Sequence, residues 1–424
     1  MSNENSKMNF ASSWSMAVGG MIGGGIFSVL GVVIQLSGSW AWLSFVLAGM
    51  IALFSAHSYS KLSLKYNEGG GSFTFLRKIN REGFAGSLSW VLILGYILTM
   101  SVYAFTFGHY VSYVFGAGPL VSRILAIAII ALLTMVNLKG VGDASTLEII
   151  TVYGKLLVLI VMACYGLYLW NPEMLTEGIE PKPFTAAITG AATIFMAYEG
   201  FQLLSYDYED LKNPSKTLPS STIWAVIAVI IVYVLVTFGT TMIVGAQTLI
   251  EQKEIALSIV GKKAAGTAGL IIVTVAAAFS TGSAINATLF STARLMENVA
   301  QKKDLPHLFI KENKNNIPLY SILVIAVFSG LLAVIGSLDK LVDVASVIFL
   351  FTFGIVNFIA YNQKIKYKYL SGLGGLLSFI ALFISLYHQF EKSPFLVIGL
   401  IAVIASLFIF RPSILKYMNN QEDK

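Results

Sequence analysis

The feature that most constrains this chain is a glycine run inside its first long apolar segment, Gly19-Gly-Met-Ile-Gly-Gly-Gly-Ile-Phe27. Each glycine in a helix interior costs about 1 kcal/mol relative to alanine, so the run should interrupt a helix. In hydrocarbon, an opened backbone is tolerated only where it lines a cavity or is buried in protein. The run therefore predicts two half-helices, roughly residues 13–22 and 27–35, that meet at an open hinge near the bilayer midplane.

An open hinge offers backbone groups to a ligand. The N-terminal end of the second half-helix presents free N–H groups and a positive dipole to an anion, and freed carbonyl groups can hold a cation. This combination suits the carboxylate and ammonium groups of a zwitterion. The residues predicted to bind it are Ile22, Gly23, Gly24, Gly25 and Ile26. The alternative is that the glycines only permit tight packing of neighbouring helices.

The composition identifies a membrane protein. Of the 424 residues, 56% are hydrophobic and 12% are charged, whereas soluble domains carry about 25% charged residues. About 20 apolar residues span a bilayer as a helix. A single integral-membrane domain is therefore expected for residues 1–424. It contains twelve predicted spans, at residues 13–36, 40–65, 84–115, 121–138, 145–170, 184–206, 221–245, 264–298, 318–337, 341–361, 370–389 and 394–411.

The basic residues predict how the spans are oriented. With the N-terminus inside, twenty of the 28 Lys and Arg residues fall in inner segments, seven in outer segments, and Lys155 within a span. This bias follows the positive-inside rule and predicts a multi-pass protein of the cell (plasma) membrane with both termini cytoplasmic. The orientation also accounts for the net charge of +6. No basic cluster has the character of a nucleic-acid footprint, so no nucleic-acid partner is expected.

A second interruption predicts an internal repeat. The sixth predicted span is broken between Gly190 and Phe201, five spans after the glycine run. Interrupted helices at matching positions in two halves indicate inverted repeats with a binding site between them. We expect repeats at about 10–170 and 184–361, followed by extra helices at about 370–411. Two independent glycine-kinked helices are the alternative.

The second break carries the other half of the predicted substrate site. Its backbone carbonyl groups are expected to hold the ammonium group, and they belong to Phe195, Met196, Ala197 and Tyr198. The adjacent Glu199 is an intramembrane carboxylate. Burying such a group costs free energy unless it is paired, hydrated or protonated, so its default interpretation is a functional role. It could attract an ammonium group, switch by protonation or bond to a gating tyrosine; alternatively it only stabilises the break. Tyr96 and Tyr103 in the third span lie two turns apart on one face and could close over the cavity, or they pack in the core.

Lys155 in the fifth span is the predicted proton-coupling residue. Burial disfavours the charged form of a lysine, so this side chain could gain and lose a proton during a cycle. Its ammonium group has the charge of a sodium ion and could fill an ion site. Snorkelling to the cytoplasmic rim is the alternative. Ser280 and Ser283 in the eighth span share about one helix face and could coordinate a cation or an ammonium group, or they join helices together.

Four ordered motifs resemble the amino acid–polyamine–organocation (APC) superfamily of transporters. They are the glycine run, the stretch Phe195-Met-Ala-Tyr-Glu-Gly-Phe201, the loop Glu209-Asp-Leu-Lys-Asn-Pro-Ser-Lys-Thr-Leu-Pro219, and the segment from Ala293-Arg-Leu to Lys303-Asp-Leu-Pro306. The resemblance implies an all-α membrane protein of the LeuT fold. That fold has a 5+5 inverted repeat plus two C-terminal helices, giving twelve transmembrane helices of which helices 1 and 6 are broken.

Within the superfamily, the chain is most similar to the sodium-independent, proton-coupled amino acid permeases of the ApcT type. These place a lysine in the fifth span where sodium-coupled relatives bind an ion, and Lys155 matches that position. The resemblance implies that Lys155 approaches the backbone at Gly19 and the hydroxyl groups of Ser280 and Ser283. Glu199 departs from the family pattern, because many relatives have an apolar residue there.

These observations predict a secondary active transporter that imports amino acids or small amines by alternating access coupled to protons. The alternatives are an exchanger without net proton movement, and a channel or non-transporting nutrient sensor. The sequence contains no nucleophile elbow, phosphate loop, dinucleotide fingerprint or zinc-ligand spacing, so no enzyme activity, cofactor or metal is expected. His57 and His109 are expected to be core or interfacial residues. The expected partners are the substrate, protons and the lipid bilayer; the preferred substrate and the oligomeric state stay open.

Overall fold

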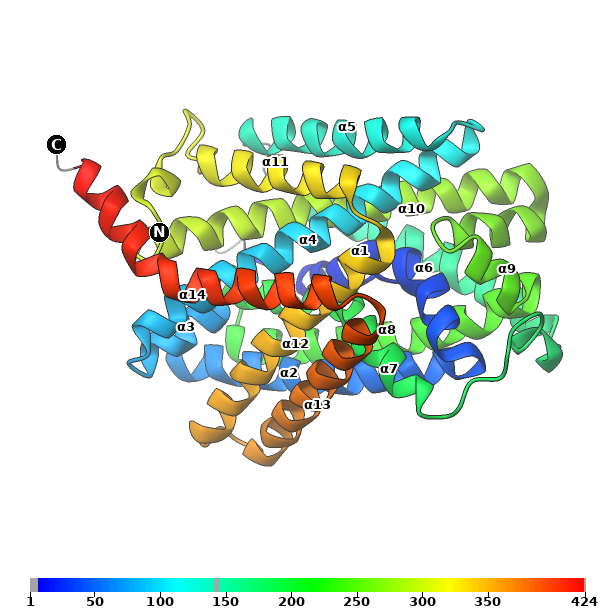
Figure 1. Cartoon of the computed structure of the whole chain (residues 1–424), viewed down its shortest axis with the longest axis horizontal. Coiled ribbons are helices and arrows are strands. Elements are labelled where there is room, and N and C mark those ends of the chain that lie inside the picture. Colours follow the sequence, from blue (N-terminus) through cyan, green and yellow to red (C-terminus); the bar gives the residue numbers. More distant parts are fainter. Residues whose placement is uncertain (1–6, 141–144, 423–424) are drawn as a thin grey trace.

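The computed structural model describes residues 7–140 and 145–422. The two chain ends, for which the sequence predicts a cytoplasmic position, therefore lie outside the described residues. The described chain is all-helical, with no β-strand (Figure 1). Its α-helices are α1 (Phe10–Ser37), α2 (Ala41–Tyr66), α3 (Gly71–Lys78), α4 (Glu82–Val114), α5 (Pro119–Leu138), α6 (Ser145–Tyr168), α7 (Ala186–Thr193), α8 (Pro214–Val244), α9 (Ala246–Glu251), α10 (Ala256–Gln301), α11 (Leu319–Ile335), α12 (Leu338–Asn362), α13 (Lys368–Lys392) and α14 (Pro394–Glu422).

Short 3₁₀ helices connect several of these elements: η2 (Gly38–Trp40), η3 (Pro172–Leu175), η4 (Phe195–Tyr198), η5 (Phe201–Ser205), η6 (Tyr208–Asp210) and η7 (His307–Ile310). Among the described residues, nine helical stretches are long and apolar enough to cross a membrane, the first of them combining α1 and α2. Together with the apolar composition, this confirms that the chain is a multi-pass membrane protein.

The helices are arranged around α1. This helix packs against α6, α8 and α10, and its glycine run is buried. In contrast, α5 and α11 lie side by side at one edge of the molecule, where α5 presents many exposed apolar side chains (Figure 1). Apolar surface that is costly in water is favourable against lipid. The core of the molecule is therefore built around the segment that carries the glycine run.

The predicted break in the first span is wrong. Helix α1 is continuous from Phe10 to Ser37 and runs through the whole glycine run, so there are no half-helices at 13–22 and 27–35. A side chain at Gly24 would overlap the Tyr103 ring, and one at Gly25 would overlap the Tyr233 hydroxyl group. The glycines therefore serve close packing, which was the alternative interpretation. Burial of α1 on all sides overrides the weak helix propensity of glycine.

The predicted break in the sixth span is confirmed. Helix α7 ends at Thr193, and after η4 the chain becomes extended at Glu199, with φ −65° and ψ 139°. Gly200 follows with φ 135° and ψ −40°, a conformation that is open to glycine and rarely to other residues. Its Cα lies against α1, because a Cβ atom built on Gly20 would come within 2.9 Å of it. The break in the sixth span and the glycine run of α1 are therefore in direct backbone contact, at Gly200 and Gly20.

Replacing Gly200 with alanine is expected to destabilise the protein by at least about 1–3 kcal/mol, the cost of holding a non-glycine residue in a disfavoured backbone region. The added Cβ would also lie 2.6 Å from the backbone nitrogen of Met21. Thermal unfolding of the purified variant measures the effect. Gly282→Ala is the matched control, since a Cβ at Gly282 meets nothing within 4 Å. Equal melting temperatures for the two variants would contradict the expected strain.

A buried ion cluster fixes the C-terminal helix α14. The guanidinium group of Arg411 forms an ion pair with Asp304, and its Nη1 donates to the carbonyl oxygen of Gly83 at 3.1 Å. Arg77 Nη1, at the end of α3, donates to the other carboxylate oxygen of Asp304 at 2.7 Å. The Trp90 indole donates to the backbone oxygen of Asp304 at 2.9 Å. The carboxylate of Asp304 therefore joins α3 and α14 to the segment that follows α10, and the backbone oxygen of Asp304 joins that segment to α4.

Candidate functional site

The break in the sixth span places a carboxyl group in the core. Glu199 is only 1% exposed. Its Oε1 accepts a hydrogen bond from Gln202 Nε2 at 2.8 Å, and its Oε2 accepts one from the Tyr103 hydroxyl group at 3.4 Å. The Gln202 side chain also accepts from the Gly200 amide at 2.9 Å. The strained turn at Gly200 and the Glu199 carboxyl group are therefore held by the same side chain.

The hydrogen bonds continue from Glu199 along η5. Gln202 Nε2 lies 3.3 Å from the Tyr96 hydroxyl group, which lies 2.9 Å from the Tyr206 hydroxyl group. Tyr206 comes directly before Asp207, and burial raises the pKa of the Asp207 carboxyl group to about 6, an effect that Arg294 partly offsets. A buried polar chain thus runs from Glu199 to the Tyr206 hydroxyl group, and the residue after Tyr206 is ionisable.

Lys155 contacts the beginning of the glycine run. Its side chain lies on α6, is 3% exposed, and donates from Nζ to the Gly19 carbonyl oxygen at 3.1 Å. Gly19 already belongs to the continuous helix α1, but a carbonyl oxygen has two lone pairs and can accept a second bond. Gly20, the next residue, packs against Gly200. The lysine and the break that carries Glu199 therefore contact consecutive residues of α1.

Two further hydroxyl groups contact carbonyl groups of the glycine run. Ser280 Oγ on α10 donates to the Ile22 oxygen at 2.9 Å. The Tyr233 hydroxyl group on α8 lies 2.7 Å from the Met21 oxygen and 2.9 Å from the Ala197 oxygen, so it bridges α1 and η4. The carbonyl groups of the continuous helix α1 therefore still accept hydrogen bonds from polar side chains. The sequence analysis expected such carbonyl groups only at an open hinge.

The remaining predicted site residues lie around the same contact. Within α1, the residues Ile22, Gly23, Gly24, Gly25 and Ile26 are all buried, as are Phe195, Met196, Ala197 and Tyr198 in η4. The Tyr198 hydroxyl group donates to the Phe45 oxygen at 2.7 Å, and the Met196 amide donates to Ser346 Oγ at 3.0 Å. Ser283 is only partly buried on α10.

Three members of the site escaped the sequence analysis: Gln202, Tyr206 and Tyr233. Gln202 had a local signal, since it is a polar residue three positions after Glu199 inside an apolar span. Tyr233 had none, because its role depends on the packing of α8 against α1. Across the described residues, no group of three His, Cys, Asp or Glu side chains is placed to hold a metal ion.

Comparison with known proteins gives consistent matches along the chain. A family model described as amino acid permease matches residues 8–418. The inner membrane transport protein YbaT of Escherichia coli (strain K12) is 26% identical over 409 residues, 94% of this chain and 95% of that protein. The serine/threonine exchanger SteT of Bacillus subtilis (strain 168) is 27% identical over 304 residues, 69% of this chain and 67% of that protein.

A human protein and a solved structure extend these matches. The large neutral amino acids transporter small subunit 2 of Homo sapiens is 27% identical over 381 residues, 85% of this chain and 68% of that protein. A crystal structure of a mutant manganese transporter from Eremococcus coleocola matches with a TM-score of 0.63 and 12% identity, covering 96% of this chain and 95% of that one. At this identity, the likeness establishes the fold alone.

The family model and the named relatives identify a membrane transporter, and in its structure polar groups and a lysine contact one central helix. The chain belongs to the amino acid permease family. The predicted resemblance to the APC superfamily is thereby confirmed, and so is the prediction that the protein is not an enzyme, because the named relatives are transporters.

Proposed function

We propose that the protein imports amino acids across the cell membrane by alternating access, coupled to protons and independent of sodium. The observation that carries the proposal is the bond from the buried Lys155 ammonium group to the Gly19 carbonyl oxygen. An ammonium group that donates to a carbonyl oxygen in the core can take the place of a bound metal ion, and loss of its proton would remove the charge from that position.

The proposed architecture is the LeuT arrangement of twelve spans. Helical segments overlap all the predicted spans, with α7, η4 and η5 together forming the sixth. The repeats would comprise about 10–170 and 184–361, with α13 and α14 outside them and both termini in the cytoplasm. Within this arrangement the sixth span is interrupted, and α1 contributes a continuous helix.

The proposed substrate site lies where the two segments meet. Carbonyl groups of η4 and α1 would hold the ammonium group of an amino acid, Glu199 would attract the additional positive charge of a cationic substrate, and Tyr96 and Tyr103 would close the site. Helix α1 is continuous, so amide groups at Gly23, Gly24 and Gly25 become available to a carboxylate only if the helix opens during the cycle. Two relatives are named for serine and threonine and for large neutral amino acids, and this supports an amino acid substrate.

Exchange is the second candidate, because one relative is named as a serine/threonine exchanger. Uptake of labelled amino acids into proteoliposomes separates the two functions. A proton-coupled importer accumulates substrate without sodium when an inward proton gradient is imposed, whereas an exchanger needs substrate inside. A carrier of either kind saturates and is stimulated by substrate on the opposite side; a channel does neither, and a sensor moves nothing. Uptake that requires sodium would contradict the proposal.

Replacing Glu199 with glutamine is expected to weaken binding of cationic substrates more than that of neutral ones. Removing one partner of a buried charge pair costs about 2–5 kcal/mol. Binding of lysine, putrescine and alanine to the same purified preparation, measured by thermal shift, tests this selectivity, because a bound ligand stabilises by mass action. Equal losses for all three ligands would show that Glu199 only supports the turn at Gly200.

A further inference from the structure

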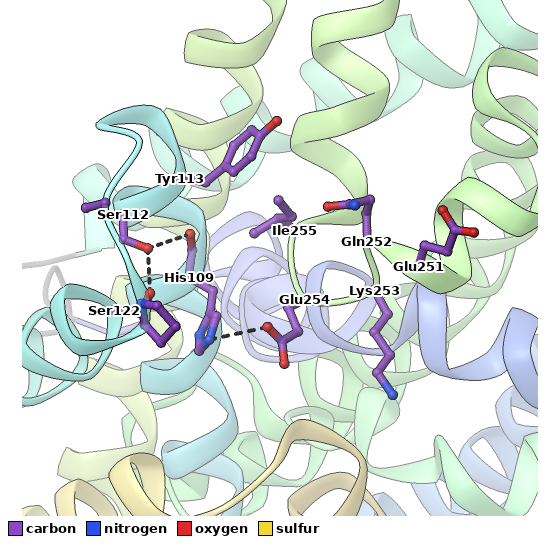
Figure 2. Close-up of a pocket in the computed structure, with 11 residues that line it drawn as sticks. His109, Ser112, Tyr113, Ser122, Glu251, Gln252, Lys253, Glu254 and Ile255 are labelled. Carbon is purple, nitrogen blue, oxygen red and sulfur yellow. Dashed lines mark hydrogen bonds and ion pairs between the residues drawn. The ribbon is translucent and has the colours of Figure 1, made fainter.

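A second polar site lies away from Lys155 and Glu199. It is a cavity of about 400 Å³ between the end of α4, the start of α5 and the link from α9 to α10 (Figure 2). His109 enters it from α4 and Glu254 from the link, and the two side chains point toward each other. Helix α4 runs from the inner side to the outer side in the proposed orientation, so the cavity would face the outside.

The geometry fixes where the protons of His109 are. Its Nδ1 lies 2.8 Å from the Phe105 carbonyl oxygen, and a carbonyl oxygen can only accept, so Nδ1 carries a hydrogen. The Phe105 ring stacks on the imidazole with 3.9 Å between ring centroids, which holds its orientation. In the neutral ring, Nε2 therefore has a lone pair and no hydrogen.

This Nε2 faces Glu254 Oε2 at 3.3 Å. Two acceptors at that separation repel each other, and the contact becomes attractive only when one proton is added, giving an imidazolium or a carboxylic acid. The contact is therefore a binding site for one proton, whether His109 or Glu254 carries that proton.

The link that carries Glu254 is anchored to α1. Lys253 pairs with Asp339 on α12 and donates to Gln35 at 3.2 Å. A Cβ at Gly31 of α1 would come within 2.5 Å of the Lys253 Cα atom, so the link packs directly on the outer half of α1. A movement of Glu254 therefore acts on the helix to which Lys155 binds.

The other charged and titratable groups around the cavity have partners of their own. Glu251 on α9 accepts from Gln247 at 2.8 Å, and Lys253 is held by Asp339. On α10, the Lys262 ammonium group lies 5.8 Å from the centroid of the Tyr113 ring. On the α5 side, Ser112 and Ser122 bond to each other at 2.6 Å and carry no charge.

We infer that His109 and Glu254 form an outer proton-binding site, distinct from Lys155, that latches the α9–α10 link to α4. With the proton bound, the contact closes the cavity. When the proton leaves, the lone pairs repel and the link separates from α4. This inference rests on the proposed orientation and does not require that transport be coupled to protons.

Accessibility of a cysteine in the cavity tests the latch. In a Cys164→Ser background, Ser122→Cys reports on the cavity and Glu180→Cys, in an exposed segment predicted to be outer, serves as the reference. A membrane-impermeant thiol reagent is applied from outside, without substrate or gradient, between about pH 5 and pH 8. Dividing the labelling rate of the Ser122→Cys protein by that of the Glu180→Cys protein corrects for the pH dependence of thiol reactivity. The ratio is expected to rise by up to about tenfold per pH unit in its steepest range.

Two conservative variants make the test specific. In Glu254→Gln, the amide group donates to the neutral Nε2, and in His109→Gln it donates to the carboxylate; both close the contact without an added proton. Both variants are expected to keep the ratio low at every pH, whereas His109→Ala raises it at every pH. A ratio that does not change with pH in the parent, or a response that survives in Glu254→Gln, overturns the inference. If the reagent labelled Ser122→Cys only from the cytoplasmic side, the outer placement of the site would be wrong. That result would not contradict the proposal that the protein takes up amino acids.

Discussion

Alanine in place of Lys155 is expected to abolish the response of amino acid uptake to an imposed proton gradient. The variant loses the ammonium group that donates to Gly19. A hydrogen bond to a charged group contributes about 1.5–3 kcal/mol, which corresponds to a roughly ten- to hundredfold change in a conformational equilibrium. Without a side chain that gains and loses this bond, protonation can no longer bias the conformation of α1.

The measurement is uptake into proteoliposomes with the gradient first clamped at zero and then imposed, for wild type and variant side by side. Exchange of substrate should persist in Lys155→Ala, because the substrate is proposed to bind at the break in the sixth span. Lys263→Ala is the matched control, since this lysine is exposed on α10. The coupling mechanism is wrong if wild type and Lys155→Ala respond equally to the gradient, or if wild type needs sodium.

The largest effect on stability is expected from Asp304→Ala. This carboxylate pairs with both Arg77 and Arg411, and the Arg411 side chain is only 6% exposed. Removing one partner of a buried ion pair leaves an uncompensated charge, which costs about 3–5 kcal/mol. The melting temperature of the purified protein should fall accordingly.

An exposed ion pair provides the comparison. Asp210 lies 3.9 Å from Arg294, and both side chains are at least half exposed, so Asp210→Ala should cost about 1 kcal/mol or less. The double variant with Asp304→Ala and Arg411→Met separates charge from packing, because it removes the buried cation as well. It should regain part of the lost stability. If Asp304→Ala melts no lower than Asp210→Ala, the cluster does not hold the helices together.

The sequence analysis correctly predicted the break in the sixth span, because the residues that cause the break are neighbours in the sequence. Glu199 and Gly200 stand together in an apolar span, and a chain that buries a carboxyl group there must supply polar partners, so the break could be predicted from a few residues. The predicted break in the first span was wrong because the residues that pack against the glycines are distant in the sequence. Gly24 meets Tyr103 and Gly20 meets Gly200, across about 80 and 180 residues of chain.

The candidate site shows the same limit. The approach of Lys155 to Gly19 was implied by resemblance to a family and not by any spacing in this chain, since 136 residues separate the two partners. Tyr233 reaches two segments at once from α8, and no periodicity within α8 identifies that contact. Side chains that bridge distant elements become visible only when the packing is known.

The ion cluster at Arg411 also has a consequence for how the protein is made. Chains are synthesised from the N-terminus, so Arg77 and Asp304 are synthesised well before Arg411. Until α14 follows, the carboxylate lacks one of its two cations and the Gly83 oxygen lacks the donor that Arg411 supplies. The contacts among α3, α4 and the segment after α10 are therefore completed only when α14 has been synthesised. A ribosome that stops before residue 411 releases a chain that contains α1 to α13 but lacks the cation that joins these segments.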